Sequence, residues 1–148
     1  ATYYRPTDQA GPDLAGLFSP SFSLSQQKPV RYVLFLQAKL KKKMDVGELS
    51  KAVKTISPQN FFTVRDTGAT LSGYEGHKAR VLKALQGYQG IIQVLVAFPL
   101  DIQDKVEAPE DSQHFAKIDS TNADLLFTAT IQRMLREVVL GQVKRKRQ

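Results

Sequence analysis

The sequence predicts a small α/β domain with the element order β-α-β-α-β-loop-α, in which a mostly parallel sheet of three to four strands is flanked by helices. Two near-continuous apolar runs, at 30–38 and 91–100, are typical of strands buried on both faces. Segments with a helical spacing of apolar residues separate and follow these runs, which favours parallel pairing. The chain has 148 residues, of which 42% are hydrophobic, so one domain can bury a substantial core.

The chain begins with an expected extended arm, residues 1–29, which holds four of the seven prolines. With prolines at this spacing, the segment shows neither a helical nor a strand pattern of apolar residues. Its aromatic residues indicate docking on the domain or on a protein partner; they are Tyr3, Tyr4, Phe18 and Phe22. The α/β domain is expected to span 30–141, and a basic tail to occupy 142–148.

The first half of the domain is expected to hold two strands around one helix. The first strand is 30–38, although the longer segment 31–44 also fits a helical spacing. The helix spans 45–57, because Asp45 and Glu48 form a capping-box pair and Pro58 follows. The second strand is 60–66, where polar and apolar residues alternate.

The middle helix is expected after the glycine-bearing loop 67–73. Ser72 and Glu75 form its capping pair, and Gly87 and Gly90 end it. Its expected buried residues are Val81, Leu82, Leu85 and Tyr88. The strand 91–100 follows.

The last part of the domain combines an acidic segment, 101–120, with a long helix, 120–141. The acidic segment is expected to be a loop, and part of it or of the arm is the candidate for an additional edge strand. Thr121 and Asp124 mark the start of the helix and Gly141 its end. Its expected core face is formed by Phe127, Ile131, Met134, Leu135 and Val138.

Charge is distributed unevenly along the chain. The net charge is +7, yet residues 101–124 hold seven acids and two lysines, a local charge of −5. The other 124 residues therefore sum to +12. A body this positive attracts phosphate backbones or anionic surfaces through its long-range field.

Three groups of cations are the candidate phosphate contacts. One follows the first strand, one lies along the middle helix and one ends the chain. They comprise Lys39, Lys41, Lys42, Lys43, Lys78, Arg80, Lys83, Lys144, Arg145, Lys146 and Arg147. Such contacts position a protein on nucleic acid without reading its sequence. The alternative for each group is a solvated surface, and for the terminal group also a transport signal.

The loop from Gly68 to Gly73 begins like a phosphate-binding P-loop. That motif continues with Lys and then Ser or Thr, where this chain has Tyr74 and Glu75. A carboxylate at that place repels phosphate, so the sequence favours an ordinary strand-to-helix turn.

His114 lies among three carboxylates, those of Glu110, Asp111 and Asp119, with no cysteine anywhere in the chain. This set of donors does not favour a transition metal, and no metal or other cofactor is expected. Neither histidine stands in a nucleophile motif, so no catalytic residue is assigned. The lack of cysteine, of a secretory signal and of an apolar run of about 20 residues favours an intracellular protein without a transmembrane segment.

Three functions follow, in order of preference. The first is a non-catalytic domain that binds RNA or DNA as a structural component of a larger nucleoprotein assembly. The second is a protein–protein interaction module that docks through residues 1–28. The third is an enzyme acting on a phosphorylated substrate, which requires the amides of 68–72 and a cation such as Lys78 to meet in one pocket.

Overall fold

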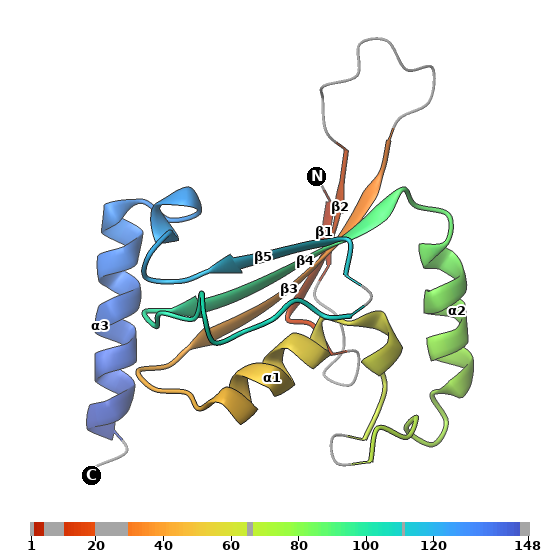
Figure 1. Ribbon diagram of the computed structural model, residues 1–148, viewed down its shortest axis with the longest axis horizontal. Helices are drawn as coiled ribbons and strands as arrows, with labels where there is room; N and C mark the ends of the chain where they lie inside the picture. The colour runs from red at the N-terminus through yellow and green to blue at the C-terminus, as the bar shows by residue number, and fades with distance from the viewer. Residues whose placement is uncertain (1, 5–10, 20–29, 65–66, 111, 146–148) are drawn as a thin grey trace.

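The computed structural model describes residues 2–4, 11–19, 30–64, 67–110 and 112–145. These residues form a small α/β protein with three α-helices and a five-stranded sheet of order β1-β2-β3-β4-β5 (Figure 1). The strands are β1 Thr2–Tyr4, β2 Leu14–Phe18, β3 Tyr32–Leu40, β4 Gly90–Phe98 and β5 His114–Ile118. The helices are α1 Val46–Thr55, α2 Glu75–Leu85 and α3 Ala129–Arg145, with 3₁₀ turns η1 Pro58–Asn60 and η2 Ala123–Leu125.

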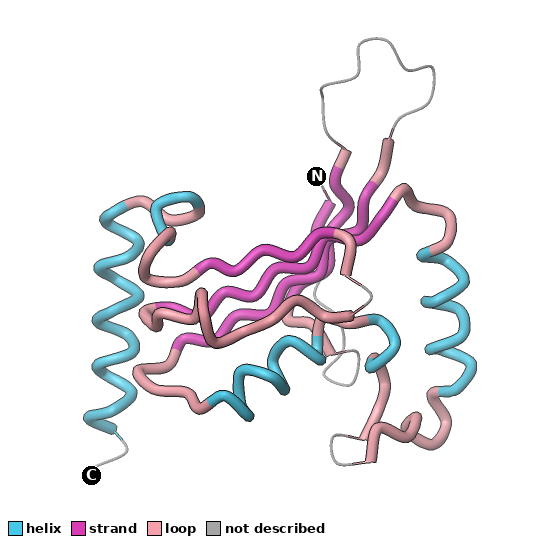
Figure 2. Tube along the Cα trace, in the orientation of Figure 1, coloured by secondary structure: helices cyan, strands magenta, loops and turns pink. Residues whose placement is uncertain are grey.

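Strands β3, β4 and β5 pair in parallel, which confirms the predicted α/β class and the two apolar strands. The sheet is larger than predicted because both candidate segments add strands to it. The acidic segment contributes β5, and the expected arm contributes β1 and β2, which run antiparallel to their neighbours. Figure 2 shows α2 and α3 at opposite ends of these strands, with α1 between them.

The N-terminal segment is joined to the body by close backbone packing. Gly11 adopts a φ of +112°, and a Cβ on it would lie 2.6 Å from the carbonyl oxygen of Thr55. Only glycine fits this approach without displacing the end of α1. Of the four aromatic residues of this segment, Phe18 is 43% exposed. Phe22 and the side chains of Tyr3 and Tyr4 lie outside the described residues.

The expected strand at 60–66 is wrong for its first half. Phe61 and Phe62 are both buried, with 3% and 7% of their surface exposed, whereas successive residues of a strand point to opposite faces. The chain instead forms η1 and then an irregular loop with one isolated bridge, between Thr63 and Thr70. Residues 65–66 lie outside the described residues.

Helix α1 forms as predicted. The Asp45 carboxylate accepts a 2.7 Å hydrogen bond from the Glu48 amide, and the Glu48 carboxylate accepts one from the Asp45 amide. Its buried residues, together with Ile56, pack on the α1-facing side of the sheet, against Val33, Phe35 and Leu95. This contact forms the main hydrophobic core.

Helix α2 begins without the predicted cap. Tyr74 precedes its first turn and makes no side-chain cap hydrogen bond, and Ser72 is exposed. The Glu75 carboxylate instead accepts from the Gly73 amide. The expected buried residues are all only half-buried, although Val81, Leu85 and Tyr88 do contact the core.

Helix α3 begins at Ala129, not at 120, and Thr121 and Asp124 do not cap it. The reason is the Asp119 carboxylate, which accepts hydrogen bonds from the Thr121 amide and hydroxyl and so turns the chain before the helix starts. The predicted stop at Gly141 is also wrong, because the helix continues to Arg145.

The predicted core face of α3 is largely exposed. Ile131, Met134 and Val138 are 43%, 57% and 52% exposed, and the helix buries Val139 instead, which is 2% exposed. The helix lies across the end of the sheet rather than along one of its faces (Figure 1). Its apolar positions therefore do not all meet the core.

Candidate nucleic-acid interface

The first group of cations lies where β3 leaves the sheet. Lys39 is half-buried in the strand, and Lys41, Lys42 and Lys43 are exposed in the short connection to α1. Lys41 forms a 3.1 Å ion pair with Glu48. Within the part of the chain that the structure describes, Lys42 and Lys43 form no ion pair. Their charge is therefore available to a ligand.

The capping box holds this lysine-rich connection in place. The hydrogen bond from Lys41 and the one from the Asp45 amide both lower the pKa of the Glu48 carboxyl, although its partial desolvation opposes them. Because Glu48 also closes the first turn of α1, the ion pair fixes the connection relative to the helix. The backbone that carries Lys42 and Lys43 is therefore held in a fixed position relative to α1.

The end of the sheet brings α3 to the same place. Leu40, the last residue of β3, is paired with Phe98 of β4. The guanidinium of Arg136 lies 4.8 Å above the Phe98 ring, and Phe127 packs edge-on against that ring at 6.2 Å. The carboxyl ends of β3 and β4 therefore abut α3, and Figure 1 shows the β3–α1 connection and the C-terminal half of α3 at one end of the molecule.

The terminal group of cations begins on this helix. Lys144 and Arg145 are part of the last turn of α3, whereas Lys146 and Arg147 lie outside the described residues. Sequence reasoning overlooked Arg133 and Arg136, which are exposed on the same helix. The three-residue spacing of these two arginines, which places them on one side of a helix, could have identified them.

The middle group of cations, on α2, lies away from the end of the sheet where the other two groups are found. Helix α2 lies at the amino ends of the parallel strands, opposite α3 (Figure 1). The Lys78 ammonium donates to the backbone oxygen of Gln59 and so ties α2 to η1. Arg80 and Lys83 are exposed but stand apart from the other two groups. The three groups do not form a single surface.

Among the described residues, the acids of 101–124 form no ion pair with the first or the terminal group of cations. The one ion pair found among the described residues is Lys41–Glu48, so none of the predicted cations that are described pairs with an acid of 101–124. One of those acids, Asp119, is fully buried and holds the Ile102 amide at 2.8 Å.

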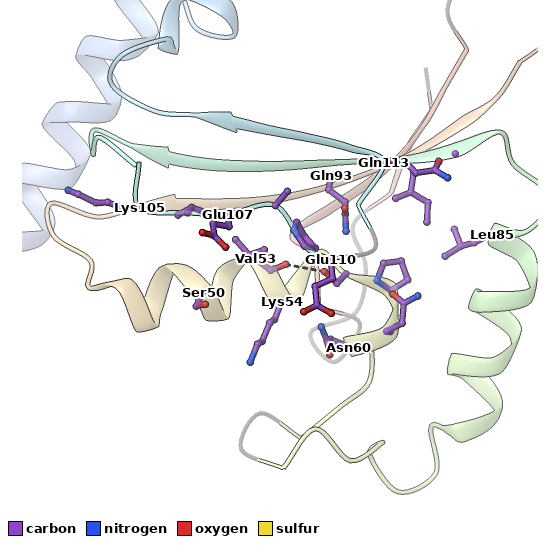
Figure 3. A pocket seen from close by; sticks show the side chains of 18 of the residues that line it. Ser50, Val53, Lys54, Asn60, Leu85, Gln93, Lys105, Glu107, Glu110 and Gln113 are labelled. Atoms are coloured by element: carbon purple, nitrogen blue, oxygen red, sulfur yellow. Dashed lines mark hydrogen bonds between the residues drawn. The ribbon is translucent and has the colours of Figure 1, made fainter. Parts of the chain in front are cut away.

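Three other acids line a pocket of about 860 Å³ between α1, η1, the end of α2 and the loop residues 104–110 and 113. In Figure 3, Ser50 and Lys54 come from α1, while Glu107 and Glu110 come from the facing loop. The inner wall includes Gln93, whose amide donates to the Ile56 oxygen at 2.8 Å. The lining holds charges of both signs, so the pocket offers no concentrated positive charge for a phosphate.

The loop from Gly68 to Gly73 has few free amides. The Gly68 amide donates to Val64, the Leu71 amide to Phe62, and the Gly73 amide to Glu75. The Ala69 amide donates to the Thr67 hydroxyl, at 3.3 Å. Because these four amides already donate to neighbouring oxygen atoms of the chain, they do not form the cradle that a phosphate requires.

No group of three or more metal-binding side chains occurs within the described residues. His114 is exposed and packs edge-on against Tyr32, with ring centroids 5.7 Å apart. In the same residues, no helix combines the length and the apolar character that a membrane span requires.

Comparison with protein-family models, with curated proteins and with solved structures finds no match to this chain.

Proposed function

We propose that this chain is a non-catalytic nucleic-acid-binding domain that serves as a structural component of a larger nucleoprotein assembly. Its interface is the basic end, defined as Lys39 and Lys41–Lys43 together with the C-terminal half of α3. The α2 cations are left out of this interface because they lie at the other end of the sheet.

The observation that carries the proposal is the placement of exposed lysines beside a helix that ends in cations. Lys42 and Lys43 project from a connection held by the capping box, and the last turn of α3 adds Lys144 and Arg145. Residues 39–55 hold six lysines and two acids, and residues 129–145 hold four cations and one acid. This excess of positive charge suits a polyanion, because each phosphate contacted releases condensed counterions.

The chemistry of these side chains favours backbone contacts over base contacts. Lysine ammonium groups bind phosphate as point charges and carry no sequence code when they contact the backbone. The domain is therefore expected to bind RNA and DNA of many sequences, with affinity set by salt.

The test is a titration of fluorescently labelled single-stranded RNA and double-stranded DNA with the full chain, followed by anisotropy. If about six phosphates are contacted, affinity for the DNA duplex is expected to fall by about 1,000-fold between ~50 and ~200 mM salt, and affinity for single-stranded RNA by at least about 100-fold. A salt-independent affinity, or no binding to either nucleic acid at the lowest salt, contradicts the proposal.

The competing hypothesis of docking through residues 1–28 needs a different experiment from a simple deletion. Because β1 and β2 belong to the sheet, removing 1–28 deletes two strands and damages the fold itself. Substitution of the exposed Phe18 by Ser leaves the strands in place and tests whether a protein partner docks on this segment.

A further inference from the structure

One side of the sheet is accessible over the amino half of its parallel strands. Side chains of a strand alternate between the two sides, and Val33 and Leu95 lie on the side that α1 covers, where both are almost fully buried. The opposite side, called the open face, carries Leu34 and Ile92, which are paired in register and only half-buried. Figure 2 shows α1 on one side of the strands and α2 and α3 at their two ends.

Ring-bearing side chains gather at the amino end of the open face. Phe18, the last residue of β2, is paired in register with Tyr32, the first residue of β3, so their side chains are direct neighbours on one side of the sheet. His114, the first residue of β5, is paired with Ile92 and therefore lies on the same side. The rings of Tyr32 and His114 meet edge-on, with centroids 5.7 Å apart. Phe18, Tyr32 and His114 are called the aromatic row.

Gly90 allows the row to cross the sheet without a break. Strand β4 lies between β3 and β5, and the register partner of Tyr32 on β4 is Gly90. A Cβ on Gly90 would lie 3.2 Å from Cε1 of the Tyr32 ring. Because glycine has no side chain, the Tyr32 ring lies across β4 and reaches His114. The rings therefore form one continuous surface from β2 to β5.

The rings of the aromatic row are accessible to a ligand. Phe18 is 43% exposed, His114 is exposed and Tyr32 is half-buried. Their apolar area contacts water at a cost that a ligand packed against it removes. Nucleobases have flat faces, and aromatic side chains on a sheet bind them by stacking, with little dependence on sequence. The row has the shape and the chemistry of such a stacking surface.

The charges around the row favour a polyanion. Strands β2, β3, β4 and β5 contain no aspartate or glutamate, so no carboxylate of these strands repels a phosphate beside the row. The exposed Arg31 immediately precedes Tyr32 and supplies a cation next to it in the chain. Glu110, the described acid nearest to His114 in sequence, lines the pocket on the α1 side of the sheet. The whole chain carries a net charge of +7, which attracts an anionic ligand to this face.

We propose that the aromatic row stacks the bases of an unpaired stretch of nucleic acid. This inference rests on the function proposed above and narrows its ligand to single strands. In a duplex the faces of the bases are covered by neighbouring bases, so the row is of use only to unpaired nucleotides, whereas the basic end contacts the phosphates of either form. Along β3, Tyr32 lies about 26 Å from Leu40, beside the basic end. A strand of about 12 nucleotides, ~40 Å long even at the ~3.4 Å spacing of stacked bases, is long enough to contact both.

Anisotropy titrations of the full chain test the row, with a labelled strand of that length used alone and annealed to its complement. At about pH 8, where histidine is neutral, Phe18→Leu/His114→Gln removes two rings and leaves the net charge unchanged. We expect this variant to bind the single strand at least about tenfold more weakly, because stacking on the lost rings no longer contributes, and the duplex within about twofold of the parent. Phe18→Tyr keeps a ring at that position and should bind both probes as the parent does. His77→Gln removes an exposed imidazole on α2 and is the control, expected to change neither affinity.

The two probes distinguish failure of the row from failure of the proposed function. If a folded double variant binds the single strand as tightly as the parent, or loses affinity equally for both probes, the row does not stack bases, although the phosphate contacts of the basic end stand. If the parent binds neither probe, both proposals are wrong. Lys42→Glu/Lys43→Glu, which removes phosphate contacts, is expected to weaken binding of both probes. Far-UV circular dichroism verifies folding, and the single variants Phe18→Leu and His114→Gln, each at an exposed side chain, give the same test if the double variant fails to fold.

Discussion

The side-chain amide of Gln37 donates a 2.7 Å hydrogen bond to the carboxylate of Asp13, and so joins the start of β2 to the buried side of β3. Gln37 is 4% exposed, and its carbonyl oxygen accepts from the Thr55 hydroxyl at 2.9 Å. One buried side chain thereby connects the N-terminal segment, the sheet and the end of α1. Asp13 also accepts from the Ala38 amide, at 2.8 Å.

Loss of the Asp13 carboxylate is therefore expected to destabilise the fold. Asp13→Ala leaves the buried Gln37 amide without its acceptor, which costs about 1–3 kcal/mol in the free energy of unfolding. Asp13→Asn keeps one acceptor oxygen and should cost less. Urea denaturation measures both. The exposed Asp104, whose side chain forms no hydrogen bond with another described residue, gives the control Asp104→Ala, expected within about 0.5 kcal/mol of the parent. Equal effects at positions 13 and 104 contradict the role of Gln37.

Local sequence was sufficient for the elements whose stability is local. The strands β3 and β4 are rich in β-branched and aromatic residues, and α1 carries its own capping box. These three elements could therefore be predicted from their own sequences. Strand β5 was expected only as one option, because HFAKI is short and lies within an acidic segment. Its pairing with β4 is a long-range contact that a local pattern does not contain.

The candidate site shows the same division. The lysine groups could be found from composition, but their relative positions depend on how α3 crosses the end of the sheet. The contact of Arg136 with Phe98 fixes that crossing and joins residues far apart in the chain. Ile131, Met134 and Val138 were predicted to be core residues but are exposed. Helical spacing identifies the apolar side of a helix, but it does not show which part of the protein packs against that side.

Stability is expected to depend on pH through Asp119. Burial alone raises the pKa of this carboxyl, but hydrogen bonds from the Thr121 hydroxyl and the Ile102 amide outweigh burial and lower the pKa below its ordinary value of 3.8. A lowered pKa in the folded state contributes stability above the unfolded value, and this contribution is lost as pH falls through the folded pKa. Acidification below about pH 4 should therefore reduce the free energy of unfolding.

The variant Asp119→Asn identifies this contribution. It is expected to lose about 1–3 kcal/mol at neutral pH, because an amide is a poorer acceptor for these donors. It should also show a smaller loss on acidification than the parent. Urea midpoints between about pH 7 and pH 2 measure both effects. Asp124→Asn removes the same charge at an exposed position and is the control. Parallel pH curves for the parent and Asp119→Asn contradict the assignment.

The cap of α1 has a separate, smaller role in stability. Asp45→Ala removes the acceptor for the Glu48 amide and is expected to cost about 1 kcal/mol, whereas Asp45→Asn retains capping ability and should stay within about 0.5 kcal/mol. Thermal unfolding followed by circular dichroism measures the difference. A loss of stability for Asn as large as that for Ala would show that charge, not the cap hydrogen bond, matters at this position.

The basic end and α2 can be distinguished by matched charge reversal. In the proposed interface, Lys42→Glu/Lys43→Glu removes two phosphate contacts and should weaken nucleic-acid binding by at least about tenfold at low salt. The slope of log affinity against log salt should become shallower by about 1.8, since each contact contributes about 0.9. Arg80→Glu/Lys83→Glu changes the net charge by the same amount on exposed residues at the opposite end. It should reduce affinity less than about threefold, through the long-range field alone. Because both proteins carry the same total charge, equal losses of affinity would mean that net charge, rather than the placement of Lys42 and Lys43 beside α3, governs binding.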